Sequence, residues 1–137
     1  MRTITHIVLH CTATPQSATV PSIQRYWRET LGWKNPGYHI IISPDGTCHR
    51  LLDDGLISNG VGGHNARALH VSYIGGVDAK GKPLDNRTDA QKRELQRIVT
   101  RWLSQHPTAQ VLGHRDFPGV TKACPSFDAR AWWASIQ

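Results

Sequence analysis

The sequence has few of the residues that would cross-link it covalently or place it in a membrane. Its 137 residues include three cysteines, an odd number at no zinc-finger spacing, which argues against a disulfide framework and for a reducing compartment. No apolar run approaches the ~20 residues that span a bilayer, and the N-terminus lacks a signal-peptide pattern. We therefore expect no membrane insertion and a protein that is cytoplasmic on synthesis.

Acidic residues are also scarce, since ten Asp and Glu stand against sixteen Lys and Arg. The formal net charge of +6 at pH 7 favours an anionic partner such as nucleic acid, lipid head groups or bacterial cell wall, and charge alone does not choose among them. The chain lacks repeats, low-complexity segments and linkers, and its length suffices for one core. We expect a single domain over residues 1–137.

Hydrophobic periodicity predicts strands and helices in alternation. Strands are expected at residues 3–11, 38–43, 48–52, 68–74 and 110–113, with an Asp-Gly turn joining the second and third. The first helix is expected to follow a polar loop that ends at Pro21 and to stop at Gly32. The second is expected from a Thr88–Gln91 capping box to a stop before Pro107, and the third after a cap at Asp128. The pattern predicts an α/β fold with a central mixed β-sheet flanked by helices.

The first helix is expected to bury one apolar face made of Ile23, Tyr26, Trp27 and Leu31. Near the C-terminus an aromatic cluster is expected to pack in the core rather than to form a platform for sugars. Its members are Phe127, Trp132 and Trp133.

Metal-binding residue types gather near the C-terminus, between Gly113 and Asp128, in a loop stiffened by two prolines. A catalytic zinc site uses three protein ligands and keeps a fourth position for water. His10, at the carboxyl end of the first strand, could join His114 and Cys124 as such a set. The spacing is not specific in itself, because a single histidine is more often a surface or hydrogen-bonded residue.

A zinc site of this kind would favour hydrolysis, because the metal lowers the pKa of bound water from ~16 to ~7. The oxyanion formed from an amide carbonyl needs a positive group beside the metal, and Lys122 is close enough in sequence to reach it. Tyr38 is a candidate for orienting the water or moving its proton. An ordinary strand aromatic is the competing interpretation of Tyr38.

Several ordered motifs together resemble a known family. They lie at residues 7–14, 37–42, 45–47, 75–78 and 113–128, and the likeness extends from about Ile4 to Trp133. They are similar to zinc-dependent N-acetylmuramoyl-L-alanine amidases of phage-lysozyme type, in the type 2 amidase and peptidoglycan-recognition-protein superfamily. The resemblance implies that superfamily's single-domain fold, and hydrolysis of the amide between N-acetylmuramic acid and L-alanine of the peptidoglycan stem peptide.

The resemblance also implies roles for individual residues. It implies one Zn²⁺ per chain, a catalytic pair, and a substrate groove. The residues concerned are His10, His114 and Cys124 for the metal, Tyr38 and Lys122 for catalysis, and His64 and Asn65 for substrate binding. Asp116, two residues after His114, is expected to support the site rather than to bind the metal.

The biological setting follows from the same resemblance. A monomeric phage or prophage endolysin is expected, made in the cytoplasm and acting on peptidoglycan in the periplasm or cell wall after a holin-type partner opens the membrane. An injected toxin or a cytosolic recycling enzyme would have similar sequence features.

Two other functions compete with the amidase interpretation. A non-catalytic muropeptide-binding module is one, although receptors of this superfamily lack the cysteine ligand that Cys124 would supply. The other is a basic nucleic-acid-binding zinc protein, suggested by Arg93, Arg97 and Arg101 on one helix face. No nucleic-acid partner is expected, because such a row is more often a solvated surface.

Overall fold

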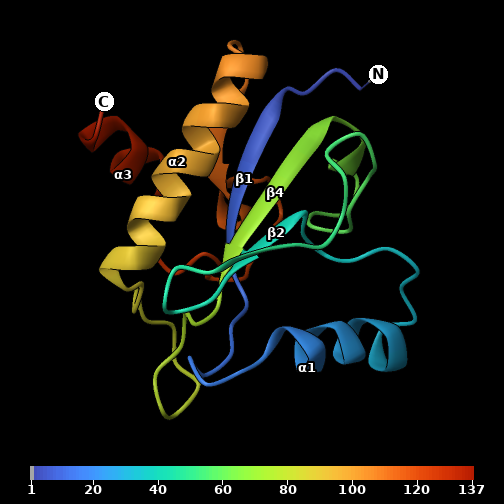
Figure 1. Cartoon of the computed structure of the whole chain (residues 1–137), viewed down its shortest axis with the longest axis vertical. Helices are drawn as coiled ribbons and strands as arrows, with labels where there is room; N and C mark the ends of the chain where they lie inside the picture. The colour runs from blue at the N-terminus through green and yellow to red at the C-terminus, as the bar shows by residue number, and fades with distance from the viewer. Residues whose placement is uncertain (1) are drawn as a thin grey trace.

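One five-stranded mixed sheet organises the protein, as seen in a computed structural model that describes residues 2–137 (Figure 1). The strand order is β3-β2-β4-β1-β5. The strands are β1 (His6–Cys11), β2 (Ile40–Ile42), β3 (Cys48–Arg50), β4 (Ala68–Tyr73) and β5 (Gln110–Gly113). Every neighbouring pair is parallel except β2 and β3, which form the predicted antiparallel hairpin. The predicted α/β fold with a mixed sheet is confirmed.

The central strands β1 and β4 are covered on both faces, so every residue of the two except His6 is buried. Alternation along β1 sends Ile7 and Leu9 to one face and Val8 and His10 to the other. Ile7 and Leu9 belong to the main core, whereas Val8 belongs to a separate cluster under the loops. His10 therefore lies on the loop-covered face of the sheet.

Two helices cover the main-core face. The long helix α2 (Asp89–Gln105) begins at the predicted capping box, and the short helix α3 (Ala129–Ser135) begins at Asp128, whose side chain accepts from the Ala131 amide. Figure 1 shows α2 lying along the sheet with α3 beside it. The predicted core role of the aromatic cluster is confirmed, because Phe127 is buried and Trp132 and Trp133 pack partly against the same core.

The first helix differs from its predicted form. α1 (Val20–Arg25) continues into a π-helical segment, Tyr26–Thr30, in which the Leu31 amide donates to the Tyr26 carbonyl. Ile23 and Trp27 are buried as predicted, but Tyr26 and Leu31 are 53% and 41% exposed, so the predicted apolar face is wrong at these two positions. The helix lies beyond the carboxyl ends of β1 and β4 (Figure 1), and its buried side chains Ile23 and Trp27 pack with Ile41 and Ile74 in a separate cluster.

Strand ends also differ from the sequence-based ranges. The first strand begins at His6 rather than at residue 3, and the second spans Ile40–Ile42, so Tyr38 precedes the ladder. Within residues 2–137 no helix has the length and apolarity needed to cross a membrane. The carboxyl ends of β1 and β5 lead into the loops 12–19 and 114–128, and the candidate site lies there.

Candidate active site

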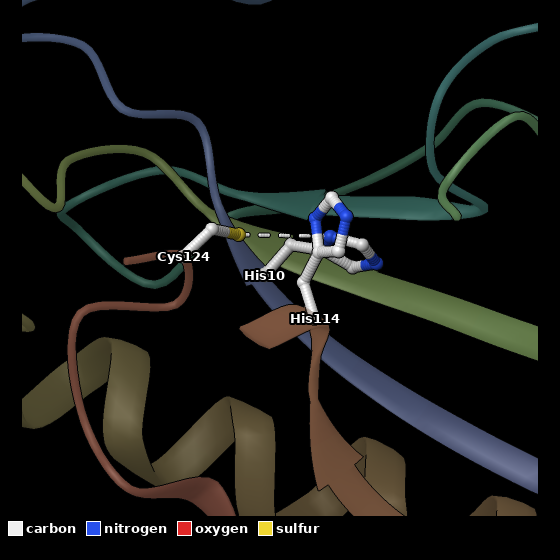
Figure 2. Close-up of side chains that lie close together, drawn as sticks. All are labelled: His10, His114 and Cys124. Atoms are coloured by element: carbon white, nitrogen blue, oxygen red, sulfur yellow. Dashed lines mark hydrogen bonds between the residues drawn. The ribbon is translucent and has the colours of Figure 1, made fainter. Parts of the chain in front are cut away.

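The three candidate metal ligands, which are far apart in sequence, meet at one point. His10 lies near the end of β1, His114 opens the 3₁₀ turn His114–Asp116 directly after β5, and Cys124 follows in the loop. Because β1 and β5 are parallel neighbours, their carboxyl ends bring the two histidines together. One potential ligand atom from each of the three side chains lies within 4.8 Å of the other two (Figure 2). This group can hold a metal ion.

The separations suit a tetrahedral ion. The Cys124 Sγ and His10 Nδ1 atoms are 3.7 Å apart (Figure 2). Typical Zn–N and Zn–S bonds at a tetrahedral angle would separate such atoms by about 3.6 Å. Two imidazoles and a thiol also bind zinc in preference to hard cations such as Mg²⁺. The residues present therefore fit a zinc ion.

Backbone hydrogen bonds fix the loop that carries Cys124. The Arg115 amide donates to the Cys124 carbonyl over 2.8 Å, which ties the turn after β5 to the cysteine. The Asp116 carboxylate accepts from the Gly113 amide, also over 2.8 Å. Asp116 thus closes the turn that presents His114, in agreement with the supporting role expected for it.

Burial keeps the two imidazoles neutral. His10 is 1% exposed, and desolvation lowers its pKa well below the ordinary value, with a further contribution from neighbouring His70. Desolvation also lowers the pKa of His114, and the charge of Lys122 adds to this. A neutral imidazole keeps a lone pair for a metal, so the site is prepared for an ion at neutral pH.

The thiol of Cys124 lies beside a second thiol, that of Cys11. Their contact raises the pKa of Cys124 and lowers that of Cys11 to about 7. The loss of the first proton is therefore a property of the two thiols together rather than of either one. Two groups favour the negative charge on Cys124: the Cys11 amide, which donates to Sγ over 3.2 Å, and the charge of Lys122. A cation bound here would favour the same arrangement, because metals bind thiolates.

A groove with a volume of about 690 Å³ leads to these residues, and both predicted catalytic side chains line it. The Tyr38 hydroxyl donates to the Cys11 carbonyl over 3.2 Å, and its ring centroid is 4.8 Å from that of His10. Burial raises the pKa of Tyr38 well above its ordinary value, so the phenol keeps its proton. Lys122 lines the groove together with His114 and Cys124.

The two predicted substrate-binding residues lie elsewhere. His64 is exposed, and its ring packs on Phe117 at 4.6 Å between centroids. The Asn65 Oδ1 atom accepts from the Val61 amide and bonds to His70 Nε2. Neither residue is among those that line the groove, so their role in substrate binding stays a prediction.

Sequence reasoning missed His70, a fully buried residue of β4 whose Nδ1 lies 2.8 Å from His10 Nε2. The available signal was a histidine inside a largely apolar predicted strand. It also missed the wall of the groove formed by Tyr26, Trp27 and Trp33, because the apolar spacing of the first helix indicated core packing.

The row of arginines on α2 is a weaker candidate for a functional surface. Arg93, Arg97 and Arg101 are exposed, and Arg97 is neutralised by Glu94 at 2.9 Å. An exposed pair of this kind is typical of a solvated helix face. The arrangement gives no support to nucleic-acid binding.

Comparison with known sequences points in a single direction. The sequence profile of the family described as N-acetylmuramoyl-L-alanine amidase, Amidase_2, matches residues 1–127. The endolysin of Klebsiella phage KP32 is 38% identical over 128 residues, which cover 93% of this chain and 83% of the relative. The endolysin of Escherichia phage T7 is 36% identical over a stretch of the same length and coverage.

Comparison with solved structures supports the fold. The endolysin of Thermus scotoductus bacteriophage Ph2119 superposes with a TM-score of 0.82 at 23% identity, covering 98% of this chain and 85% of the other. Drosophila PGRP-LB superposes with a TM-score of 0.79 at 16% identity, covering 98% and 82%. At these identities the likeness concerns architecture alone.

Proposed function

The chain belongs to the N-acetylmuramoyl-L-alanine amidase family, and from this we propose that the groove at His10, His114 and Cys124 is the centre of a zinc-dependent peptidoglycan amidase. The protein hydrolyses the amide between N-acetylmuramic acid and L-alanine of the stem peptide. The observation that carries the proposal is the cluster of two imidazoles and a thiol within 4.8 Å, at a groove lined by Tyr38 and Lys122. The whole of residues 1–137 would act as one catalytic domain.

His10, through Nδ1, His114 and Cys124 would hold one zinc ion per chain. An ion with three protein ligands and an open fourth position activates water for attack on a carbonyl. The protein's part is to keep the imidazoles neutral by burial and to hold Cys124 against the Cys11 amide.

Lys122 would stabilise the negative charge that develops on the carbonyl oxygen of the scissile amide. Its charge acts on the site already, because it contributes to the lowered pKa values of His10 and His114. A single positioned donor of this type is typically worth ~3 kcal/mol of transition-state stabilisation.

Tyr38 would orient the attacking water through its hydroxyl group. The phenol retains its proton and lies next to His10, so it is a hydrogen-bond donor at the reaction centre. Release of its hydrogen bond to the Cys11 carbonyl would free that donor for water or substrate.

The groove suits a glycopeptide in composition. Tyr26, Trp27 and Trp33 supply aromatic surface on one side, while Thr12 and Asn59 supply polar groups. Aromatic rings accept the apolar faces of sugars, and hydroxyl and amide groups bond to peptide and acetamido groups. The exposed His64 would contact only a substrate that extends beyond the groove.

An assay on purified peptidoglycan tests the proposal. Protein stripped with a chelator, and the same protein reloaded with zinc, would be incubated with sacculi, followed by measurement of new N-terminal alanine and of new reducing sugar ends. We expect alanine amino groups from the zinc-loaded sample only, and no reducing ends. Reducing ends without alanine would contradict the amidase assignment, and binding without either product would indicate a muropeptide-binding module.

The similarity to phage endolysins supports a role in lysis. We propose that the monomer is made in the cytoplasm and reaches the cell wall when a holin-type partner opens the membrane. Activity on intact sacculi at least as high as on soluble muropeptides would agree with lysis. A strong preference for soluble fragments would indicate recycling instead.

A further inference from the structure

We propose that Asn65 and His70 form a positioning pair, which holds His10 in the tautomer with its proton on Nε2 and the free lone pair of Nδ1 on the side of Cys124. The inference rests on the proposed function in one respect, namely that a metal binds at His10. It assigns Asn65 a role behind the site rather than in contact with substrate.

The Val61 amide can only donate, so it fixes which atoms donate and which accept in the hydrogen bonds that follow. This N–H donates to the side chain of Asn65 over 2.8 Å, so the Asn65 atom that receives it is the carbonyl oxygen Oδ1. The same oxygen lies 3.0 Å from His70 Nε2. Because Oδ1 only accepts, His70 carries its proton on Nε2.

The tautomer of His70 determines that of His10. A neutral imidazole with its proton on Nε2 has an acceptor at Nδ1. His70 Nδ1 lies 2.8 Å from His10 Nε2, so His10 must supply the proton from Nε2. The remaining nitrogen, His10 Nδ1, is then unprotonated, and it is the atom that lies 3.7 Å from Cys124 Sγ.

The surroundings of His70 show that its ring is closely fitted. A Cβ atom added at Gly60 would lie 2.2 Å from His70 Nδ1 and 2.5 Å from two ring carbons, so only glycine leaves space for the imidazole. The His70 amide donates to His39 Nδ1 over 3.1 Å, which anchors the main chain beside the ring. The side chain is fully buried and has little freedom to turn.

His39 provides an internal comparison. Its ring is also fully buried and lies parallel to that of His70, with centroids 6.1 Å apart. Its nitrogens, however, bond to the His70 amide and the Leu56 carbonyl, and so join strand to loop. His39 is a structural histidine, whereas both ring nitrogens of His70 lie in the series that ends at His10.

These hydrogen bonds would preorganise His10 for binding a metal ion. A free histidine divides its proton between two nitrogens, and only the form with an unprotonated nitrogen toward the ion can bind it. Partners that accept the other N–H commonly fix the ligating tautomer, and their loss typically lowers metal affinity 10–100-fold. A carboxylate or a carbonyl usually serves, whereas here a neutral imidazole does so without adding charge.

Nuclear magnetic resonance of the metal-free protein at neutral pH tests the tautomers directly. Long-range ¹H–¹⁵N correlation of the histidine rings reports which nitrogen is protonated. We expect the Nε2–H tautomer for both His10 and His70. A spectrum with the His10 proton on Nδ1 would overturn the proposal, whatever the variants do and whether or not the enzyme proves to be an amidase.

Zinc affinity, measured by competition with a chromogenic chelator, provides the second test. His70→Leu keeps the volume but removes the acceptor, and we expect a 10–100-fold weaker affinity. His70→Asn restores an acceptor near Nδ1 and should stay within about threefold of the wild type. Asn65→Leu, which frees the His70 tautomer, should fall between them, and His39→Asn should bind zinc like the wild type.

These affinities separate positioning from packing. Thermal unfolding of each metal-free variant gives the cost to the fold. If His70→Leu binds zinc as tightly as the wild type, or if His70→Asn is as weak as His70→Leu, the proposal is wrong. If His70→Leu does not fold, the wild-type tautomers and the affinity of His70→Asn still decide. Amidase activity does not enter these readouts, so its absence would count against the proposed function alone.

Discussion

At the scale of single residues, the chemistry depends on three groups that differ in how they act: a thiol at Cys124, an ammonium at Lys122 and a phenol at Tyr38. All three line the same groove. Each is removed by a substitution that changes few other atoms. The proposed roles can therefore be separated by measuring zinc content and turnover together.

Cys124→Ser should lose zinc and activity together, because a hydroxyl is a much poorer zinc ligand than a thiolate. Cys48→Ser is the matched control, since the Cys48 thiol bonds to Glu94 on α2, away from the groove. Metal analysis after gel filtration and release of alanine amino groups would measure both properties. Zinc retained in full by Cys124→Ser would remove that residue from the ligand set.

Lys122→Ala should keep its zinc and lose turnover by about 10²–10³-fold, the typical cost of one donor to an oxyanion. The comparison is with Lys80→Ala, which removes the same charge from an exposed loop outside the groove. Zinc content and initial rates on peptidoglycan decide. Equal rates in the two variants would show that Lys122 contributes only general charge.

Tyr38→Phe should retain fold and zinc with a large fall in turnover, because only the hydroxyl is lost. The hydrogen bond from that hydroxyl to the Cys11 carbonyl is worth about 1 kcal/mol, so the melting temperature should change little. Wild-type turnover in this variant would return Tyr38 to the role of a structural aromatic.

At the scale of elements, the sequence predicts best what is determined locally. The caps of α2 and α3 and the hairpin between β2 and β3 depend on residues a few positions apart, and all were found where expected. The metal candidates were also found together, because the carboxyl ends of the parallel neighbours β1 and β5 meet at one edge of the sheet and the loop after His114 returns Cys124 to it.

Other features depend on contacts between distant segments. α1 continues into a π-helical segment, Tyr26 and Leu31 are exposed and line the groove, and 3.6-residue periodicity gives no sign of either feature. The contact between His70 and His10 joins residues 60 positions apart, on neighbouring strands. The register of β1 and β4, which aligns Val8 with His70, had to be known first.

The loop over residues 53–67 gives a prediction at this scale. Gly60→Ala should displace the His70 ring, because the new methyl group would lie 2.2 Å from its Nδ1, and should lower both stability and zinc affinity. Gly62→Ala is the matched control, since a Cβ there meets no atom within 4 Å. Chemical denaturation and chelator competition measure the two effects. Equal behaviour of the two variants would contradict the close fit around His70.

At the scale of the whole molecule, the most unusual feature is a row of buried histidines. His10, His39 and His70 are at most 1% exposed, and desolvation is the largest cause of the lowered pKa of each. The unfolded chain binds protons at these positions near pH 6.5, whereas the folded chain does not until the pH is lower. The histidines therefore favour folding above that pH and oppose it below.

Metal-free protein should accordingly lose stability as the pH falls below about 6.5, the ordinary histidine value. Each histidine that binds a proton only in the unfolded chain adds ~1.4 kcal/mol per pH unit to the slope. Urea denaturation between neutral pH and mildly acid pH would measure the free energy of unfolding. A flat dependence over this range would show that the buried rings bind protons at the same pH in the folded and unfolded chains, and would contradict the lowered pKa values.

Every proposed catalytic role depends on one zinc ion held by His10, His114 and Cys124 at the groove. Diffraction from crystals of the zinc-loaded protein, collected on both sides of the zinc absorption edge, tests it most directly. We predict a single anomalous peak at about 2.0–2.3 Å from His10 Nδ1, a ring nitrogen of His114 and Cys124 Sγ. A peak elsewhere, a peak bonded to His10 Nε2, or no peak in fully loaded protein would contradict a zinc site at these three residues.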